Sequence, residues 1–162
     1  MIDNKTARWV MIGNFVRYIG FFCLLFYMPI YFTKTYPERV SDFSQYNALI
    51  EIFLANISAL MGGLLSDKFE KETYYSKPAI VIGSAVISGP IMCLGLLEPD
   101  NFAFSMWMVG LHFVFSQAFE SPGITMLQNS TESQKQGFAN AINQTVLTLG
   151  GLLSTTLFGI IV

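Results

Sequence analysis

The stretch Ala79-Ile-Val-Ile-Gly-Ser-Ala-Val-Ile87 decides the fold class. Its apolar side chains fall on every side of a helix, and residues 78–97 around it contain no charged residue. Strands of a membrane β-barrel would be about half as long and would alternate apolar with polar residues. Because a helix needs about 20 apolar residues to cross the hydrocarbon of a bilayer, this stretch predicts a transmembrane helix.

Four further stretches have the same character, and they cover residues 9–33, 44–66, 102–127 and 137–162. The sequence therefore predicts an all-α membrane protein, with five transmembrane helices in a single domain over residues 1–162. No water reaches unpaired backbone groups at that depth, so regular helices are required. Prolines inside the spans should appear as kinks, and they are Pro29, Pro90 and Pro122.

The composition supports this class and excludes others. Hydrophobic residues make up 52% of the chain and charged residues 12%, whereas soluble domains carry about 25% charged residues. The net charge of −2 and the lack of a basic patch exclude a nucleic-acid partner. His112 is the single histidine, and neither Cys23 nor Cys93 has a second thiol nearby in sequence. The sequence thus predicts no enzyme, no metal and no cofactor.

The basic residues of the short connections predict the orientation. One side collects six of them and the other only two, Lys34 and Arg39; the six are Lys5, Arg8, Lys68, Lys71, Lys77 and Lys135. Basic residues stay in the cytoplasm, so the N-terminus should be cytoplasmic. The choice between a plasma and an endolysosomal membrane is left open. The chain stops at Val162 inside an apolar run, which favours a piece of a longer transporter.

Arg17 and Glu120 are the clearest candidates for function, because a charge inside a membrane is costly. Each lies about 12 Å from the cytoplasmic end of its span. A carboxyl group in a low-dielectric medium tends to keep its proton, and a movable arginine releases it. The pair could therefore exchange a proton, or it could be a fixed salt bridge between helices. His112 shares the predicted face of Glu120, and Tyr27 shares that of Arg17.

Two further polar groups remain ambiguous. Glu51 could be a protonated site of a coupled transporter, or a carboxyl group that turns toward water at the mouth of a cavity. The last span carries a polar stripe at helical spacing, Asn140, Gln144, Thr148, Gly151 and Thr155. Such a stripe should face either a cavity or another helix.

The segment Gly62-Gly-Leu-Leu-Ser-Asp-Lys-Phe-Glu-Lys71 resembles the Gly-x-x-x-Asp-Arg/Lys-x-Gly-Arg/Lys loop of the major facilitator superfamily. Gly63, Asp67, Lys68 and Lys71 match this loop, and Glu70 replaces its second glycine. In that family the loop joins the second and third helices of each six-helix half and closes a cytoplasmic gate. The resemblance implies that Asp67 meets a helix end of the other half, which this chain does not supply.

Further stretches resemble the Spinster-like branch of that superfamily, in its C-terminal half. They are Arg17-Tyr-Ile-Gly20, Met28-Pro-Ile-Tyr-Phe32, Tyr46-Asn-Ala-Leu-Ile50, Glu120-Ser-Pro-Gly-Ile-Thr-Met126 and Gln128-Asn129. The resemblance implies helices seven to eleven of a twelve-helix carrier, whose N-terminal half would be a missing partner.

The function that this resemblance implies is secondary active transport by alternating access, with proton coupling. The expected solute is amphipathic or lipid-like, such as a lysophospholipid or a sphingolipid. Sugars, organic anions and drugs are the alternative solutes. The alternative from another class is a non-transporting membrane scaffold, in which Arg17 and Glu120 merely tie helices together.

Overall fold

The computed structural model describes residues 4–71, 73 and 75–161, and this part of the chain is almost entirely helical and contains no strand. Four helical runs in it are long and apolar enough to cross a membrane, namely Lys5–Thr35, Pro37–Glu70, Ser76–Leu97 and Phe102–Asn129. Each overlaps a predicted span. The fifth predicted span coincides with α7, Gln136–Ile161, and its crossing of a bilayer stays a prediction. The all-α membrane fold is confirmed.

The chain divides into two compact units. Unit 1 comprises the described residues of Met1–Tyr31 and Ile124–Val162, and unit 2 comprises those of Phe32–Gly123. Two helices pass from one unit to the other, α1 (Lys5–Thr35) and α6 (Glu120–Asn129). The prediction of a single domain over residues 1–162 remains a prediction, and each unit is described by itself.

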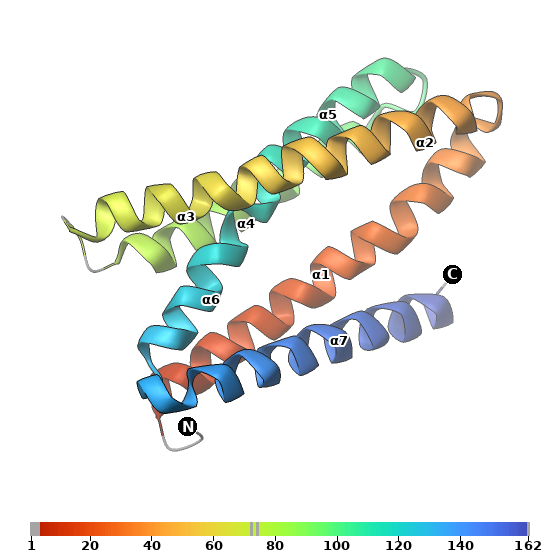
Figure 1. The fold of residues 1–162 in the computed structure, drawn as a ribbon. Coiled ribbons are helices and arrows are strands. Elements are labelled where there is room, and N and C mark those ends of the chain that lie inside the picture. Colours follow the sequence, from red (N-terminus) through yellow and green to blue (C-terminus); the bar gives the residue numbers. More distant parts are fainter. Residues whose placement is uncertain (1–3, 72, 74, 162) are drawn as a thin grey trace. The chain divides into compact units, whose positions relative to one another are not determined.

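Unit 2 contains three successive helical runs that pack against one another (Figure 1). The first run consists of η1 (Pro37–Arg39), α2 (Val40–Leu49), η2 (Ile50–Ala55) and α3 (Asn56–Glu70). The second is α4 (Ser76–Leu97), and the third is α5 (Phe102–Ser116), continued by η3 (Gln117–Phe119) and the start of α6. Helices α4 and α5 lie side by side, and α3 packs against both α4 and η3. Short connections make each run antiparallel to the next.

The first run is not a uniform α-helix. Its middle segment η2 is a π-helix of six residues that contains Glu51. A π-helix pairs residue i with i+5, so its turn is wider than that of an α-helix, and such turns occur frequently at functional sites. The predicted span 44–66 lies within the helical run Pro37–Glu70, but its local geometry differs from the regular helix that was expected.

The third run breaks where Pro122 enters it. A proline has no backbone N–H to donate to the carbonyl four residues earlier, which here is that of Ala118, and its ring crowds that carbonyl. The chain passes through the 3₁₀ segment η3 immediately before this point. The regular α-helical geometry is thus interrupted next to Pro122, and this interruption is the Pro122 break; the kink predicted there stays a prediction. Pro29 and Pro90 lie inside α1 and α4, both of which continue through them.

Unit 1 pairs α1 with α7 (Figure 1). Asn4 caps α1, because its Oδ1 accepts hydrogen bonds from the backbone N–H groups of Thr6 and Ala7 at 3.0 and 3.4 Å. Its Nδ2 also donates to the Ser130 carbonyl at 2.7 Å. Ala7 packs with Leu127 and Ala139 in a small buried cluster.

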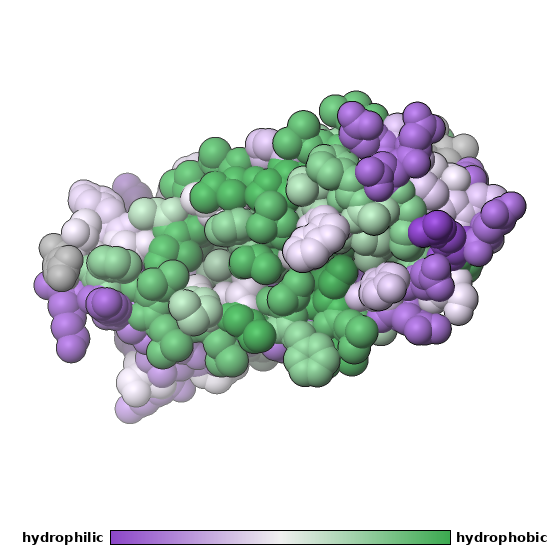
Figure 2. Space-filling view, turned by 90° about the horizontal axis from the view of Figure 1, so that it is seen from above, coloured by the Kyte–Doolittle hydropathy of each residue, from purple (hydrophilic) through white to green (hydrophobic). Residues whose placement is uncertain are grey.

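Much of the surface is apolar. Figure 2 shows hydrophobic residues over the middle of the visible face and hydrophilic ones toward its ends. Large exposed side chains come from every long helix, and they include Trp9, Val16, Leu60, Leu64, Ile82, Val86, Trp107 and Leu152. A soluble protein rarely exposes so much apolar surface. These residues are the expected lipid contacts of an integral, multi-pass membrane protein.

Candidate functional site

Arg17 lies on α1 and is half-buried. Gly13 and Gly20 lie at helical spacing on either side of Arg17, and a Cβ atom added to either would find no atom within 4 Å. The Arg17 side chain lies between these two positions, and its Nε is shielded from solvent. A neighbouring face of α1 is closed, because Asn14 is buried there and donates from Nδ2 to Asn143 Oδ1 of α7 at 3.1 Å.

Tyr27 lies further along α1, on the helix face predicted to contain Arg17, and here this face packs against α7. Its ring lies 5.5 Å from that of Phe158, measured between centroids. Its hydroxyl oxygen would be 4.0 Å from a Cβ built on Gly159. Tyr27 therefore packs against α7.

Glu120 is the first residue of α6 and is half-buried. The 3₁₀ segment η3 separates it from His112 and Ser116, which lie on α5. The common face predicted for these residues assumed a continuous α-helix, so its register is interrupted here. Arg17 belongs to unit 1 and Glu120 to unit 2, and their pairing stays a prediction.

His112 is buried between α4 and α5. Its Nδ1 lies 2.9 Å from the Ser88 carbonyl oxygen, and because a carbonyl can only accept, the Nδ1 carries the proton in this contact. The geometry gives His112 a role in joining two helices. Its predicted place in a proton pathway is not tested by this contact.

Glu51 lies in η2 and is half-buried. Asn47 Nδ2, one turn earlier, donates to Glu51 Oε1 at 2.8 Å. Asn56, just after the π-helix, donates from Nδ2 to the carbonyl of Ile52 at 2.7 Å and approaches that of Glu51 at 3.5 Å. Two amide side chains thus bracket the wide turn that holds the carboxylate.

The polar stripe of α7 has a mixed environment. Asn140 Oδ1 accepts from Gln128 Nε2 at 3.3 Å, and Gly151 lies against the ring of Phe22. Gln144 and Thr148 are exposed. The stripe therefore meets another helix at Asn140 and Gly151, and is open between them. The fully packed face of α7 runs beside it, through Ala139, Asn143, Gly150 and Ser154.

The glycines of the predicted gating loop allow a very close approach. A Cβ built on Gly63 would lie 2.6 Å from Ser121 Oγ, and one on Gly62 would lie 2.1 Å from the Ala118 carbonyl oxygen. No real Cβ atom fits at such distances. Gly62 therefore lets α3 reach the backbone of the third run, at the carbonyl to which Pro122 cannot donate, while Gly63 lies against the side chain of Ser121.

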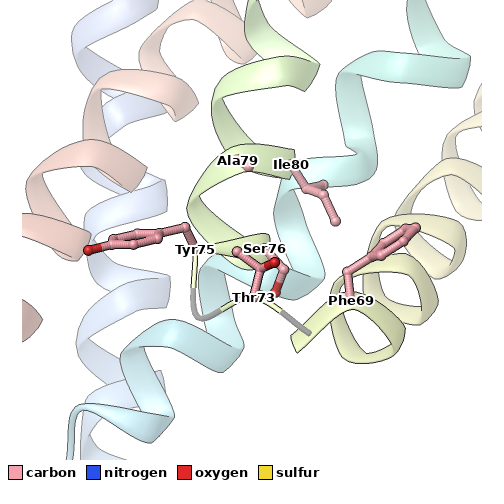
Figure 3. A pocket seen from close by; sticks show the side chains of 6 residues that line it. All are labelled: Phe69, Thr73, Tyr75, Ser76, Ala79 and Ile80. Carbon is pink, nitrogen blue, oxygen red and sulfur yellow. The ribbon is translucent and has the colours of Figure 1, made fainter. Parts of the chain in front are cut away.

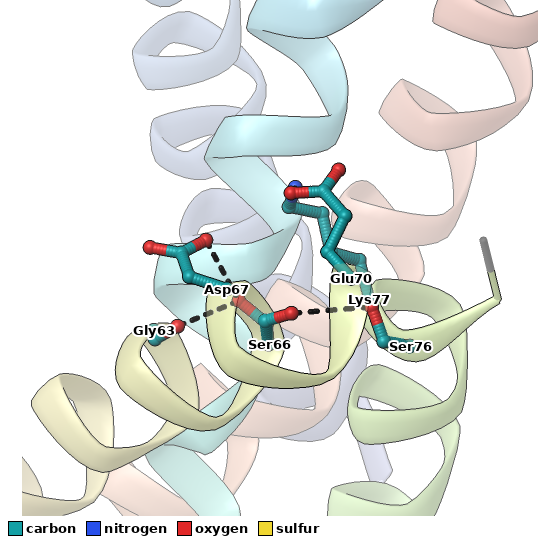
Figure 4. A network of polar contacts seen from close by, with 6 residues as sticks. All are labelled: Gly63, Ser66, Asp67, Glu70, Ser76 and Lys77. Atoms are coloured by element: carbon teal, nitrogen blue, oxygen red, sulfur yellow. Dashed lines mark hydrogen bonds and ion pairs between the residues drawn. The ribbon is translucent and has the colours of Figure 1, made fainter. Parts of the chain in front are cut away.

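The charged residues of the loop are exposed. Ser66 Oγ donates to the Gly63 carbonyl at 2.8 Å and lies 3.5 Å from Asp67 Oδ1 (Figure 4). Lys68 lies over the ring of Phe69, with its Nζ 6.0 Å from the centroid. In the described part of the chain neither Lys68 nor Lys71 forms an ion pair with Asp67. Asp67 thus presents its carboxylate outward.

A comparison with family models decides the family. The model described as Major Facilitator Superfamily matches residues 3–162. The chain belongs to the major facilitator superfamily. It is 25% identical over 161 residues to a protein of Arabidopsis thaliana named "Probable anion transporter 3, chloroplastic". The match covers 96% of this chain and 30% of that relative, so the chain spans about a third of the relative's length. No solved structure matches.

Sequence reasoning missed two polar contacts of this major facilitator chain. Lys77 is buried, and its Nζ lies 2.5 Å from Glu70 Oε2 (Figure 4). Glu70, which replaces the loop glycine, is thus the partner of a lysine seven residues later. The second is the buried pair of Asn14 and Asn143. The similar depths of Asn14 and Asn143 after the starts of the predicted spans 9–33 and 137–162 could have indicated that pair.

A hollow of about 270 Å³ lies where α3 ends and α4 begins. Its lining residues are Phe69, Thr73, Tyr75, Ser76, Ala79 and Ile80 (Figure 3). It contains none of the predicted site residues. Among the described residues no group of three or more His, Cys, Asp or Glu side chains is arranged to hold a metal ion.

Proposed function

We propose that this chain is part of a secondary active transporter that carries an anionic solute by alternating access, with Arg17 as the cation that meets the solute. The observation that carries the proposal is the half-buried Arg17 inside an apolar helix, between two glycines at which an added Cβ would meet no atom within 4 Å. A guanidinium group at the centre of a membrane helix costs about 2.5–3.5 kcal/mol on insertion scales. Its planar set of donors binds carboxylates and phosphates well.

The name of the Arabidopsis relative, an anion transporter, supports an anion as the solute. The Spinster-like resemblance favours a narrower class, a lipid-like solute such as a lysophospholipid. These two possibilities share an anionic headgroup, which is the part that Arg17 would bind. Sugars and uncharged drugs are less well matched to a cation in the pathway.

Proton coupling is the second part of the proposal. Glu120 lies next to the Pro122 break. One backbone hydrogen bond of the helix is already missing there, so the helix can bend at this point at little further cost. A carboxyl group at such a point can alternate between a protonated state and a state paired with Arg17. The rest of the transporter would supply the opposite wall of the transport pathway and the helix end that receives Asp67. In the Spinster-like assignment that part includes the N-terminal half.

The test is uptake into liposomes of the protein with all the segments that its gene encodes. Candidate solutes are phosphate, a dicarboxylate, a lysophospholipid and a neutral sugar, with and without a pH gradient. Arg17→Ala should lower anion uptake by about tenfold or more, since charged hydrogen bonds contribute about 1.5–3 kcal/mol. Glu120→Gln should retain exchange of labelled solute but lose the response to the pH gradient.

The matched control is Arg8→Ala, because Arg8 lies on the same helix and is exposed. It should leave uptake unchanged. Sugar uptake without anion uptake would contradict the proposed solute. Normal uptake by both Arg17→Ala and Glu120→Gln, with both proteins folded, would favour the scaffold alternative in which these residues only tie helices.

A further inference from the structure

The geometry points to Glu51 as a proton-binding site, built from the π-helix η2 and the amide of Asn47, separate from the predicted pair of Arg17 and Glu120. The role of this site rests on the proposed transporter function, because a second proton site would contribute to the coupling of protons to solute transport. The experiment that tests the site does not require transport.

The first observation is an imbalance between donors and acceptors. Asn47 Nδ2 donates to Glu51 Oε1 at 2.8 Å, while Asn47 Oδ1 is buried and has no hydrogen-bond partner in the described part of the chain. A buried acceptor without a donor costs free energy. Adjacent to it is a carboxylate, which also only accepts. A proton on Glu51 would supply the missing donor.

The amide of Asn47 suits both states of the carboxyl group. When Glu51 is ionised, the Nδ2 group donates to it, as in this structure. When Glu51 is protonated, rotation of the amide places Oδ1 where it can accept the carboxyl proton. Asn47 can therefore satisfy Glu51 before and after a proton binds, which a purely donating neighbour such as lysine could not do.

The second observation is the wide turn itself. The π-helix spans Ile50–Ala55, and Asn56 caps its carbonyls at Glu51 and Ile52. Gly110 of α5 faces this turn, because a Cβ built there would meet Leu54 at 3.5 Å and Ile50 at 3.8 Å. The apolar side of the turn is thus packed on α5, and the polar side holds Glu51.

No other titratable group pairs with Glu51 in the described part of unit 2. The elements packed against η2 are α2, α3 and α5. Their charged or titratable side chains are Asp42, Tyr46, Asp67, Lys68, Glu70 and His112, and none forms a hydrogen bond or ion pair with Glu51. A metal cation is disfavoured because this site offers only two oxygen-bearing side chains, whereas a hard cation such as Ca²⁺ takes six to eight ligands.

The experiment is labelling with dicyclohexylcarbodiimide, which adds to a protonated carboxyl group in apolar surroundings and rearranges to a stable N-acylurea. The whole protein in liposomes is labelled across the pH range in which it stays folded, and Glu51 is read out by peptide mass spectrometry. Labelling of Glu51 should fall as the pH rises and should not respond to sodium at constant pH. Glu51→Gln should abolish it, and Glu98→Gln, in an exposed connection, should not change it.

Asn47→Leu tests the role of the amide. Charge-assisted hydrogen bonds are stronger than neutral ones, so loss of Asn47 should destabilise the ionised carboxylate more than the neutral form. Labelling of Glu51 at a given pH should therefore be higher in the variant than in the wild type. An unlabelled Glu51 at every pH, or protection by sodium, would overturn the inference. Even if Asn47→Leu does not fold, these wild-type results decide it. Transport without Glu51 labelling would refute this site alone, and labelling without transport would refute the proposed function alone.

Discussion

Helix α3 meets the third run of unit 2 through backbone, whereas α1 meets α7 of unit 1 through side-chain amides. In the first contact Gly62 lies against the Ala118 carbonyl, so closely that a Cβ would be 2.1 Å from the oxygen. In the second, Asn14 and Asn143 form one hydrogen bond of 3.1 Å. Lipid tails are as apolar as leucine, so membrane helices associate through close packing and polar contacts. The first of these two contacts relies on close packing and the second on a polar bond.

The ion pairs in the connections between helices also differ between the two units, in how deeply they are buried. In unit 2 the ion pair of Lys77 with Glu70 buries its lysine, whose side chain is 5% exposed. In unit 1 the pair of Lys135 with Glu132 is exposed on both sides. A substitution in a closely packed or buried contact should lower the stability strongly, and a substitution in an exposed contact should lower it little. The predictions below test this ranking.

Gly62→Ala should have the largest effect. The new Cβ would meet a backbone oxygen that cannot rotate away, and overpacking of this kind costs about 1–3 kcal/mol. The melting temperature in detergent measures the loss. Gly83→Ala is the matched control, because a Cβ at Gly83 meets nothing within 4 Å and alanine favours a helix by about 0.5–1 kcal/mol. Equal melting temperatures for the two variants would show that the close approach does not contribute to stability.

Asn143→Leu should have a smaller effect, about 1 kcal/mol, because hydrogen bonds between membrane helices average about 0.6 kcal/mol and Asn14 is left unpaired. The double variant Asn14→Leu with Asn143→Leu should recover part of the loss, since neither amide then remains buried without a partner. Thermal unfolding of the two single variants and the double variant gives the coupling free energy between Asn14 and Asn143. Gln144→Leu, at the next and exposed position, is the control. Purely additive losses would contradict a direct bond.

Lys135→Gln should have the smallest effect on stability. The hydrogen bond and the charge of Lys135 hold the pKa of the Glu132 carboxyl group below its ordinary value. A carboxyl group with a lowered pKa stabilises the folded state above its unfolded pKa, and this contribution is lost as the pH falls through the lowered value. The variant should raise the pKa of Glu132, as followed by carbon-13 NMR titration, with no measurable change in melting temperature at neutral pH. An unchanged titration would exclude the pair in solution.

The sequence predicts helices well here because hydropathy and length are local properties. The spans 78–97 and 102–127 match α4 and the third run closely. A departure from regular geometry near Pro122 was also open to prediction, because a proline affects only its own turn. The contact that Gly62 makes with Ala118 was not, since it joins residues 56 positions apart.

The candidate site was predicted less completely, for reasons that differ among its residues. Arg17 and Glu120 stand out in any apolar run because they are charged. The partner of Glu51 is a plain asparagine, and the π-turn that positions both leaves no mark in the composition. The exchange of a loop glycine for Glu70 could be interpreted only once Lys77 was found beside it.

The π-helix η2 has a consequence for how this chain can vary. A turn that pairs residue i with i+5 accommodates one residue more than an α-helical turn, so it is equivalent to a single-residue insertion absorbed inside a span. Loss of one residue between 50 and 55 would therefore leave a plain α-helix that keeps the later residues, Gly62 among them, on the same faces. Loss of one residue from the regular helix between 56 and 61 would instead rotate Gly62 by about 100° and turn it away from Ala118. This span should therefore tolerate the loss of a residue in its wide turn better than in the regular helix that follows.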